Sequence, residues 1–431
     1  MKAIAERIFK LNEHHTTLGK ESIAGVVAFL SIIYIVAINA TILSDAGIPF
    51  EAGVFATVIT SFIGCLLMAF WANAPIILVP GMGINALFTY TMVQSMGLSW
   101  QEALCAVFVS GVLFVLLAFS RVSTVLVKSI PHSLKEAITV GVGLFLTFIG
   151  LQKGGIVKPS ETTFVALGDL SSPAVLATLI TLAITVVLFI RNVQGNFLIS
   201  MAIGSLLAWL LGVVPAASEA PVQNGATFFD SFAVLSFSGV AKISFWAAVF
   251  SMTMVLIFEN IGLIHGHLQM TGREDKFSKA FQANAVSSML CGIFGTSPTV
   301  STVESATGIA SGGRTGFTSF ITGTLFLVSL LFIPILKLVP NSAIAPILIV
   351  IGGLMIQNIK NINLQDLTEG FPAFLIIALI PLTYSIADGI AFGFIAYPLL
   401  KVSLGRIKDV SIAMYIIAFL FLLNFVLHYM S

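Results

Sequence analysis

Two carboxylic acids lie inside apolar stretches of this 431-residue chain. Glu304 belongs to the segment Gly-Thr-Ser-Pro-Thr-Val-Ser-Thr-Val-Glu-Ser-Ala-Thr-Gly at 295–308, which is rich in Ser and Thr. Glu259 lies near the middle of the apolar run 244–269. An acid exposed to lipid costs about 2.5–3.5 kcal/mol on insertion scales, so each must face a cavity, find a partner or take up a proton. A carboxyl group shielded from water takes up a proton more readily, so either acid can carry a proton that moves together with a substrate.

The proline at 298 predicts a broken membrane segment. Proline blocks a continuous helix, and the hydroxyl residues that follow are good N-caps. We therefore expect a short extended stretch and then a half-helix that begins near the bilayer midplane. Irregular backbone is tolerated at that depth only where it lines a cavity or is packed in protein. Free N–H groups at the half-helix N-terminus, together with Ser301, Thr302 and Glu304, then form a candidate binding site.

A second segment carries a matching break. Residues 76–88 read Ile-Ile-Leu-Val-Pro-Gly-Met-Gly-Ile-Asn-Ala-Leu-Phe, with a Pro-Gly pair followed by one polar side chain, Asn85. Two interrupted segments at corresponding places point to a transporter binding site, so we place Asn85 in or beside it. Phe258, next to Glu259, is a candidate to stack on a planar ligand, although core packing is the ordinary role of Phe. We expect His265 and His267 to pack at the membrane interface.

Composition limits the class of protein. Hydrophobic residues make up 58% of the chain and charged residues 9%, which excludes a soluble globular domain. The formal net charge of +1 provides no basic face for nucleic acid. The three cysteines lie in apolar runs without disulfide or metal-ligand spacing, so we expect no metal and no cofactor. The protein is expected to lie in the plasma membrane or bacterial inner membrane.

The apolar runs predict an all-α polytopic membrane protein with about fourteen segments, most of them near the ~20 residues needed to span. A further run at 410–429 is either a fifteenth span or a helix against the bundle. With residues 1–22 cytoplasmic, only four of the 20 Lys and Arg residues fall in outer loops, as the positive-inside rule requires. These four are Lys153, Lys158, Lys242 and Lys337. The expected segments are 23–44, 52–71, 76–96, 101–120, 131–151, 173–190, 196–213, 244–269, 278–294, 298–312, 316–336, 342–358, 371–386 and 387–403.

An internal repeat relates the two halves. Residues 108–114 (Phe-Val-Ser-Gly-Val-Leu-Phe) match 320–326 (Phe-Ile-Thr-Gly-Thr-Leu-Phe) at an offset of 212, and 131–133 match 340–342 at an offset of 209. The repeat unit therefore holds seven segments. Because seven is odd, the halves must have opposite topology, which is the inverted-repeat architecture of secondary transporters.

Several motifs resemble the AzgA-like purine permeases of the nucleobase–ascorbate transporter superfamily. They are Pro-Gly-Met-Gly-Ile-Asn at 80–85, Glu-Ser-Ala-x-Gly at 304–308, Gly-Gly-Arg-Thr-Gly at 312–316 and Pro-Leu-Thr-Tyr-Ser-Ile-Ala-x-Gly-Ile at 381–390. The resemblance runs from about Gly19 through Lys401. It implies a seven-plus-seven inverted repeat and proton-coupled import of purine bases by an elevator-like motion, commonly as a homodimer in the lipid membrane.

The resemblance also implies a division into domains and a set of functional residues. A core domain would comprise residues 1–120 and 244–338, and a gate domain residues 121–243 and 339–431. Asn85, Glu259 and Glu304 would be the substrate and coupling residues. The chain departs from the family pattern at Phe258-Glu259-Asn260, where Phe-Asp-Thr is usual, and at Asn284, where an acid is common. The Glu-Asn form resembles the uracil and xanthine branches instead.

Hydrogen-bonding chemistry favours oxopurines. Guanine presents a ring N–H beside an exocyclic amine, two donors that one carboxylate can accept. Hypoxanthine, xanthine and uracil offer at least one ring N–H, whereas adenine presents a bare ring nitrogen to the acid. An unpaired buried acceptor costs about 1–3 kcal/mol, so an ionised acid selects against adenine. The hypothesis is guanine and hypoxanthine import, with xanthine, uracil or adenine as alternatives.

Other functional classes fit the sequence less well. A channel or anion exchanger could direct half-helix N-termini at an anion, but two intramembrane acids without a central Lys or Arg argue against an anion. No paired Asp, Ser/His pair or His-Glu-x-x-His motif lies at membrane depth in the sequence, so we do not expect an enzyme.

Overall fold

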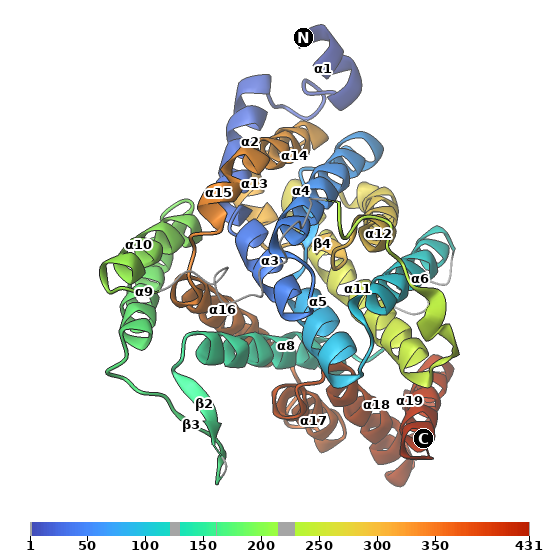
Figure 1. Cartoon of the computed structure of the whole chain (residues 1–431). Coiled ribbons are helices and arrows are strands. Elements are labelled where there is room, and N and C mark those ends of the chain that lie inside the picture. Colours follow the sequence, from blue (N-terminus) through green and yellow to red (C-terminus); the bar gives the residue numbers. More distant parts are fainter. Residues whose placement is uncertain (1, 121–129, 161, 214–228, 431) are drawn as a thin grey trace.

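The computed structural model of the chain describes residues 2–120, 130–160, 162–213 and 229–430. The start of the predicted gate domain at residue 121 and the loop cations Arg121 and Lys128 lie outside the described residues. Helices make up most of the described chain, and they pack into one bundle from which a small hairpin projects (Figure 1).

The N-terminal part of the described chain, up to residue 210, contains nine α-helices, and π-helical turns at Met68–Ala72 and Leu87–Ser95 extend two of them. These helices are α1 (Lys2–Phe9), α2 (Leu18–Ile32), α3 (Ile35–Asp45), α4 (Phe50–Leu67), α5 (Met82–Ala86), α6 (Trp100–Phe119), α8 (His132–Lys153), α9 (Pro173–Ile190) and α10 (Asn196–Leu210). The later helices are α11 (Ile243–Thr271), α12 (Phe277–Phe294), α13 (Ser305–Ala310), α14 (Gly316–Ser329), α15 (Ile333–Leu336), α16 (Asn341–Ile356), α17 (Leu367–Thr383), α18 (Ile386–Ser403) and α19 (Ile412–Met430).

Local sequence signals explain where several helices begin. Ser99 and Glu102 form a capping box at the start of α6, in which each side chain accepts from the other residue's backbone N–H. Thr17 caps α2 and Asp366 caps α17 through side-chain oxygens. Pro173 occupies the first position of α9, where its missing N–H is no loss.

Nine helical stretches in the described part are long and apolar enough to cross a membrane, and three shorter apolar helices accompany them. Every range predicted from the sequence contains a helix or a half-helix. The multi-pass all-helical class is confirmed. The count of about fourteen spans stays a prediction, because the nine long and three shorter apolar helices of the described chain are fewer than fourteen. The last helix, α19, packs against α18 and α11.

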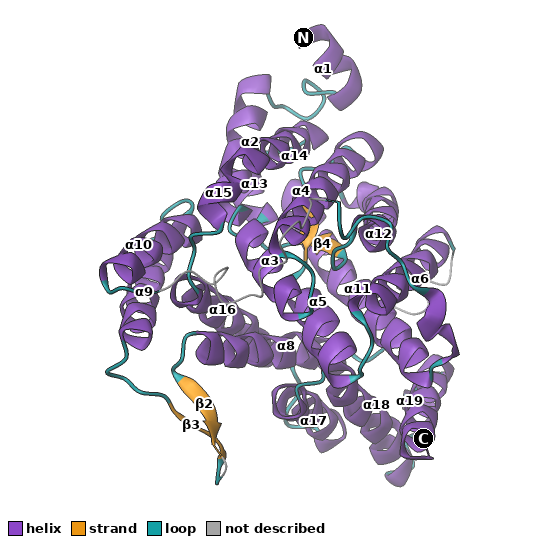
Figure 2. Cartoon of the chain, in the orientation of Figure 1, coloured by secondary structure: helices purple, strands orange, loops and turns teal. Residues whose placement is uncertain are grey.

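The two interrupted segments cross inside the bundle. Strands β1 (Leu78–Pro80) and β4 (Thr299–Ser301) pair antiparallel, with Val79 opposite Val300 at the centre. Both strands are fully buried, and Figure 2 shows β4 surrounded by helices. Each strand leads into a half-helix, α5 or α13. The predicted extended stretches are confirmed.

Close packing between helices falls into two groups. In the first, α6 packs on α11 and α12, and α4 packs on α3, α12 and α14. In the second, α8 packs on α16 and α17, α16 on α9 and α10, and α17 on α18. A glycine permits the close packing of α6 on α12, because a Cβ on Gly111 of α6 would lie 2.3 Å from the Met289 Cα atom of α12. We call these sets the first and second helix groups.

A short hairpin was not predicted. Strands β2 (Val157–Ser160) and β3 (Phe164–Leu167) pair antiparallel and extend away from the helices (Figure 2). Phe164 at its turn is 92% exposed. The segment contains Lys158 and Pro159, residues that are depleted in strands, and this explains why the sequence pattern indicated only an outer loop.

Candidate functional site

Glu304 is the N-cap of the half-helix α13 and is half-buried. Its carboxylate Oε1 accepts a hydrogen bond from the hydroxyl of Tyr34, which lies between α2 and α3 and is 1% exposed. The two residues are 270 positions apart, so only the folded chain brings them together. Tyr34 thereby holds the acid at the end of the β1–β4 crossing.

Glu259 lies halfway along α11 and is also half-buried. Its carboxylate makes no hydrogen bond or ion pair with any residue that the structure describes. The next residue, Asn260, is fully buried; its Nδ2 donates to the Leu256 carbonyl at 2.8 Å, and its Oδ1 accepts from the Ser301 backbone N–H at 2.9 Å. Asn260 therefore fixes α11 against β4, so both acids belong to the same packed junction.

Ser301 takes part in that junction through its hydroxyl as well. The Ser301 Oγ lies 3.0 Å from Nδ1 of His267, a side chain that is 5% exposed. The prediction that His267 packs at the membrane interface is therefore wrong, whereas His265 is exposed and contacts the edge of Phe277. Because its hydroxyl and backbone N–H already have partners, Ser301 is suited to position the site. The Thr302 hydroxyl is also buried, and it interacts with the Glu304 carboxylate.

Asn85 of α5 is completely buried, and neither its Oδ1 nor its Nδ2 has a hydrogen-bond partner among the described residues. Asn284 of α12, where the family pattern has an acid, is buried and unpaired in the same way. A buried amide without partners costs free energy, so its presence needs an explanation such as a ligand that supplies the partners. The unpaired amide of Asn85 fits the predicted binding role.

Asn39 of α3 shows how a satisfied amide supports the same region. Its Nδ2 donates to Thr57 Oγ1 at 2.7 Å and to Thr296 Oγ1 at 3.0 Å, and its Oδ1 accepts from Ser297 Oγ at 3.3 Å. The N-terminus of α13 is tied to the other broken segment by a hydrogen bond from the Ile77 N–H to Ser305 Oγ at 3.1 Å. These bonds hold the Ser- and Thr-rich turn before β4 in place.

The structure therefore brings Glu304, Ser301, Thr302 and the Glu259–Asn260 pair to one junction, and it buries Phe258 beside them at 8% exposure. Asn85 lies on the half-helix that follows the paired strand β1. Tyr34 was missed by the sequence analysis. A lone hydroxyl in an apolar run was the only available signal, and the chain offers many of these.

The sequence model of the permease family matches residues 19–427. The chain belongs to this family. Within it, the chain is 50% identical over 382 residues to "Nucleobase transporter PlAzg2" of Paenibacillus larvae, covering 88% of this chain and 77% of that protein. The family membership and the purine permease branch inferred from the motifs are confirmed.

Two further permeases match nearly end to end. "Guanine/hypoxanthine permease PbuO" of Bacillus subtilis is 38% identical, with 97% of this chain and 99% of that protein covered. "Adenine permease AdeP" of Escherichia coli is 36% identical, with 99% and 96% covered. Among solved structures, the transmembrane domain of the cyanobacterial bicarbonate transporter BicA superposes with a TM-score of 0.69 over 86% of this chain and 97% of that one. At 17% identity, that likeness shows the shared fold alone.

Replacing Asn85 and Asn39 by leucine, one at a time, separates a ligand-binding amide from a structural one. We expect Asn85→Leu to keep or raise the apparent unfolding temperature of the ligand-free protein, because it removes two unpaired polar atoms. Asn39→Leu should lower that temperature, because three hydrogen bonds of about 1 kcal/mol each are lost. Thermal unfolding of the purified variants in one detergent measures both effects. A large destabilisation by Asn85→Leu would show that Asn85 has a structural partner instead.

Proposed function

We propose that this permease is a secondary active transporter that imports purine nucleobases, with guanine and hypoxanthine as its substrates. The observation that carries the proposal is the position of Glu304, an acid at the start of a half-helix where two broken segments pair. Two relatives are named as permeases for guanine and hypoxanthine or for adenine, and these names support a purine as the substrate. Purine nucleobase transport is the coarser statement on which these relatives agree.

Glu304 is the proposed ligand of the base edge. Its carboxylate has two oxygens, and Tyr34 occupies only Oε1. The remaining acceptor capacity suits the paired N–H groups of guanine, which one carboxylate can bind in a bidentate manner. Asn85 supplies unpaired polar atoms for the other edge of the base, Thr302 supplies a hydroxyl beside Glu304, and Phe258 contributes apolar surface. Ser301, Asn260 and Tyr34 act by positioning these groups.

Glu259 is the proposed carrier of the coupling proton. It has no cation and no hydrogen-bond donor beside it in the described chain, and it lies in the middle of a long apolar helix. A charged carboxylate in such a place is costly, and binding a proton removes that cost. The next residue, Asn260, accepts a hydrogen bond from β4 of the proposed substrate site. Protonation of Glu259 can therefore affect that site through Asn260.

An elevator-like motion is proposed between the two helix groups, which we assign as the core and gate domains. One of the sets of contacts between the groups is centred on Asp45. Asp45 of α3 forms an ion pair with Lys153 of α8 at 2.6 Å and accepts from the Tyr90 hydroxyl at 2.7 Å. Within the second group, Tyr384 at the end of α17 donates to Gln152 of α8, and the Tyr384 ring contacts the ring of Tyr90. Lys153 is one of the four cations that the positive-inside rule places outside, so we assign this cluster to the outer side of the membrane.

Substitution of Glu304 tests the substrate assignment. We expect Glu304→Gln to weaken guanine binding roughly ten- to a hundred-fold, because a charge-assisted hydrogen bond is worth about 1.5–3 kcal/mol. The same change should improve adenine binding, since a glutamine amide can both donate to a bare ring nitrogen and accept from the exocyclic amine. Uptake of radiolabelled guanine in competition with unlabelled bases measures this change, with Glu13→Gln, an exposed acid, as the control. Parental uptake competed by adenine alone would overturn guanine as the substrate.

Substitution of Glu259 tests the coupling assignment. We expect Glu259→Gln in proteoliposomes to bind and exchange base but not to accumulate it when the outside is made acidic. In the parent, an inward gradient of one pH unit supports about tenfold accumulation if one proton moves with each base, because that gradient stores about 1.4 kcal/mol. Counterflow, which needs no gradient, is the control for a folded carrier. Gradient-driven accumulation by Glu259→Gln equal to that of the parent would exclude this acid as the proton site.

Reversible cross-linking tests the proposed motion. We expect the double variant Asp45→Cys with Lys153→Cys to lose uptake when a short thiol-reactive cross-linker joins the two positions, and to regain it after reduction. The native cysteines do not compete, because Cys65, Cys105 and Cys291 are buried. Each single cysteine variant treated in the same way is the matched control. Full uptake in the cross-linked double variant would exclude separation of the helix groups at this end.

A further inference from the structure

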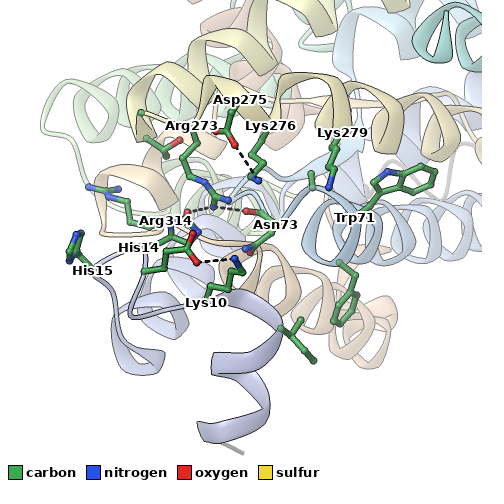
Figure 3. Close-up of a pocket in the computed structure, with 16 residues that line it drawn as sticks. Lys10, His14, His15, Trp71, Asn73, Arg273, Asp275, Lys276, Lys279 and Arg314 are labelled. Atoms are coloured by element: carbon green, nitrogen blue, oxygen red, sulfur yellow. Dashed lines mark hydrogen bonds and ion pairs between the residues drawn. The ribbon is translucent and has the colours of Figure 1, made fainter.

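A cavity of about 750 Å³ lies at the opposite end of the first helix group from the Asp45 cluster. Its walls come from the turn after α1, the end of the π-helical turn that follows α4, the α11–α12 connection and the loop before α14 (Figure 3). The positive-inside rule assigns these connections to the cytoplasm. No residue of the candidate substrate site lines this cavity.

The cavity carries an excess of positive charge. Its cations are Lys10, Arg273, Lys276, Lys279 and Arg314, and its only acids are Glu13 and Asp275. Both acids already have partners, since Lys10 pairs with Glu13 at 2.9 Å and Lys276 with Asp275 at 3.2 Å. Within the described chain, the other three cations have no carboxylate within ion-pair distance.

The two arginines are fixed in place by backbone carbonyl groups. Arg273 is 6% exposed, and its Nη1 donates to the Asn73 oxygen at 2.6 Å and to the Arg314 oxygen at 3.0 Å. Arg314 uses its own Nη1 to donate to Ile309 and Gly313. Burial lowers the pKa of the Arg273 guanidinium, yet an arginine keeps its charge at neutral pH, so an anion nearby would offset the cost of burial. Burial, and then the charge of Arg273, lowers the pKa of His14, which therefore adds no charge there.

One edge of the cavity is apolar. Ile8, Phe70 and Trp71 line it and are 45%, 53% and 37% exposed. Phe70 contacts Phe9 of the amphipathic helix α1, and Trp71 contacts Phe119 at the end of α6. Trp and Lys side chains at a helix end are typical of the membrane interface. A phosphate group held by the cations would place any attached acyl chain along this edge.

We propose that this cavity binds a phosphate group, with Arg273, Lys279 and Arg314 as its ligands. Guanidinium groups match the geometry of phosphate oxygens, and a lysine adds a mobile point charge. The headgroup of an anionic phospholipid is one source of such a group, and a soluble phosphate compound of the cytoplasm is the other. The aromatic edge favours the lipid.

The test uses the full-length protein in mixed micelles. Phosphatidylglycerol is compared with phosphatidylcholine at equal mole fraction, and in separate samples inorganic phosphate is compared with chloride at equal ionic strength. We expect phosphatidylglycerol to raise the unfolding temperature by several degrees more than phosphatidylcholine does, and Lys279→Gln to reduce that difference by half or more. Lys279 is exposed and without an ion-pair partner in the described chain, so this variant should fold normally.

Lys360→Gln, an exposed lysine predicted on the same side of the membrane but outside the cavity, is the matched control and should respond like the parent. A shift with inorganic phosphate alone that falls in Lys279→Gln would also support the site and would assign it to a soluble phosphate compound. No shift with either probe, or a shift that is equally large in Lys279→Gln, would overturn the proposal.

Discussion

Three residue pairs of β1 and β4 meet inside the helix bundle, and the rest of the proposed site depends on this backbone pairing. Unpaired N–H and C=O groups are costly away from water, so an interrupted membrane segment must find partners for them. Each broken segment here provides them for the other. Because the strands are antiparallel, the half-helices α5 and α13 leave from opposite ends of the pairing, as an inverted repeat requires.

Side-chain hydrogen bonds hold the paired strands and the residues beside them in place. The Asn260 side chain accepts a hydrogen bond from the Ser301 N–H of β4. The Ser305 hydroxyl accepts one from the Ile77 N–H of the other broken segment. Asn39 binds the turn that precedes β4. The second broken segment is therefore held by α3, by α11 and by the first broken segment, and Glu304, three residues after β4, lies within this hydrogen-bonded region. A rigid surrounding of this kind lets a single carboxylate discriminate between bases.

The breaks at Pro80 and Pro298 could be predicted from the sequence because proline acts locally, and the apolar runs located the helices because burial in lipid requires length. Glu304, Glu259 and Asn85 were visible because polar groups are rare in such runs. The Tyr34–Glu304 bond was not, since it joins positions 270 apart and many hydroxyl groups could have served. His267 was misjudged for a similar reason. Its distance from the end of α11 suggested an interface, but the strand β4 packs over it.

Tyr34 has a second contact with a consequence for transport. The edge of its ring lies against Phe197 of α10, with the ring centres 5.1 Å apart. Such a contact contributes about 0.5–1.5 kcal/mol, and it joins the two helix groups through the same side chain that holds Glu304. A base bound to the remaining acceptor positions of Glu304 would share that carboxylate with the Tyr34 hydroxyl. In the proposed elevator-like motion, occupancy of the site and movement of one helix group past the other would then be linked through one aromatic residue.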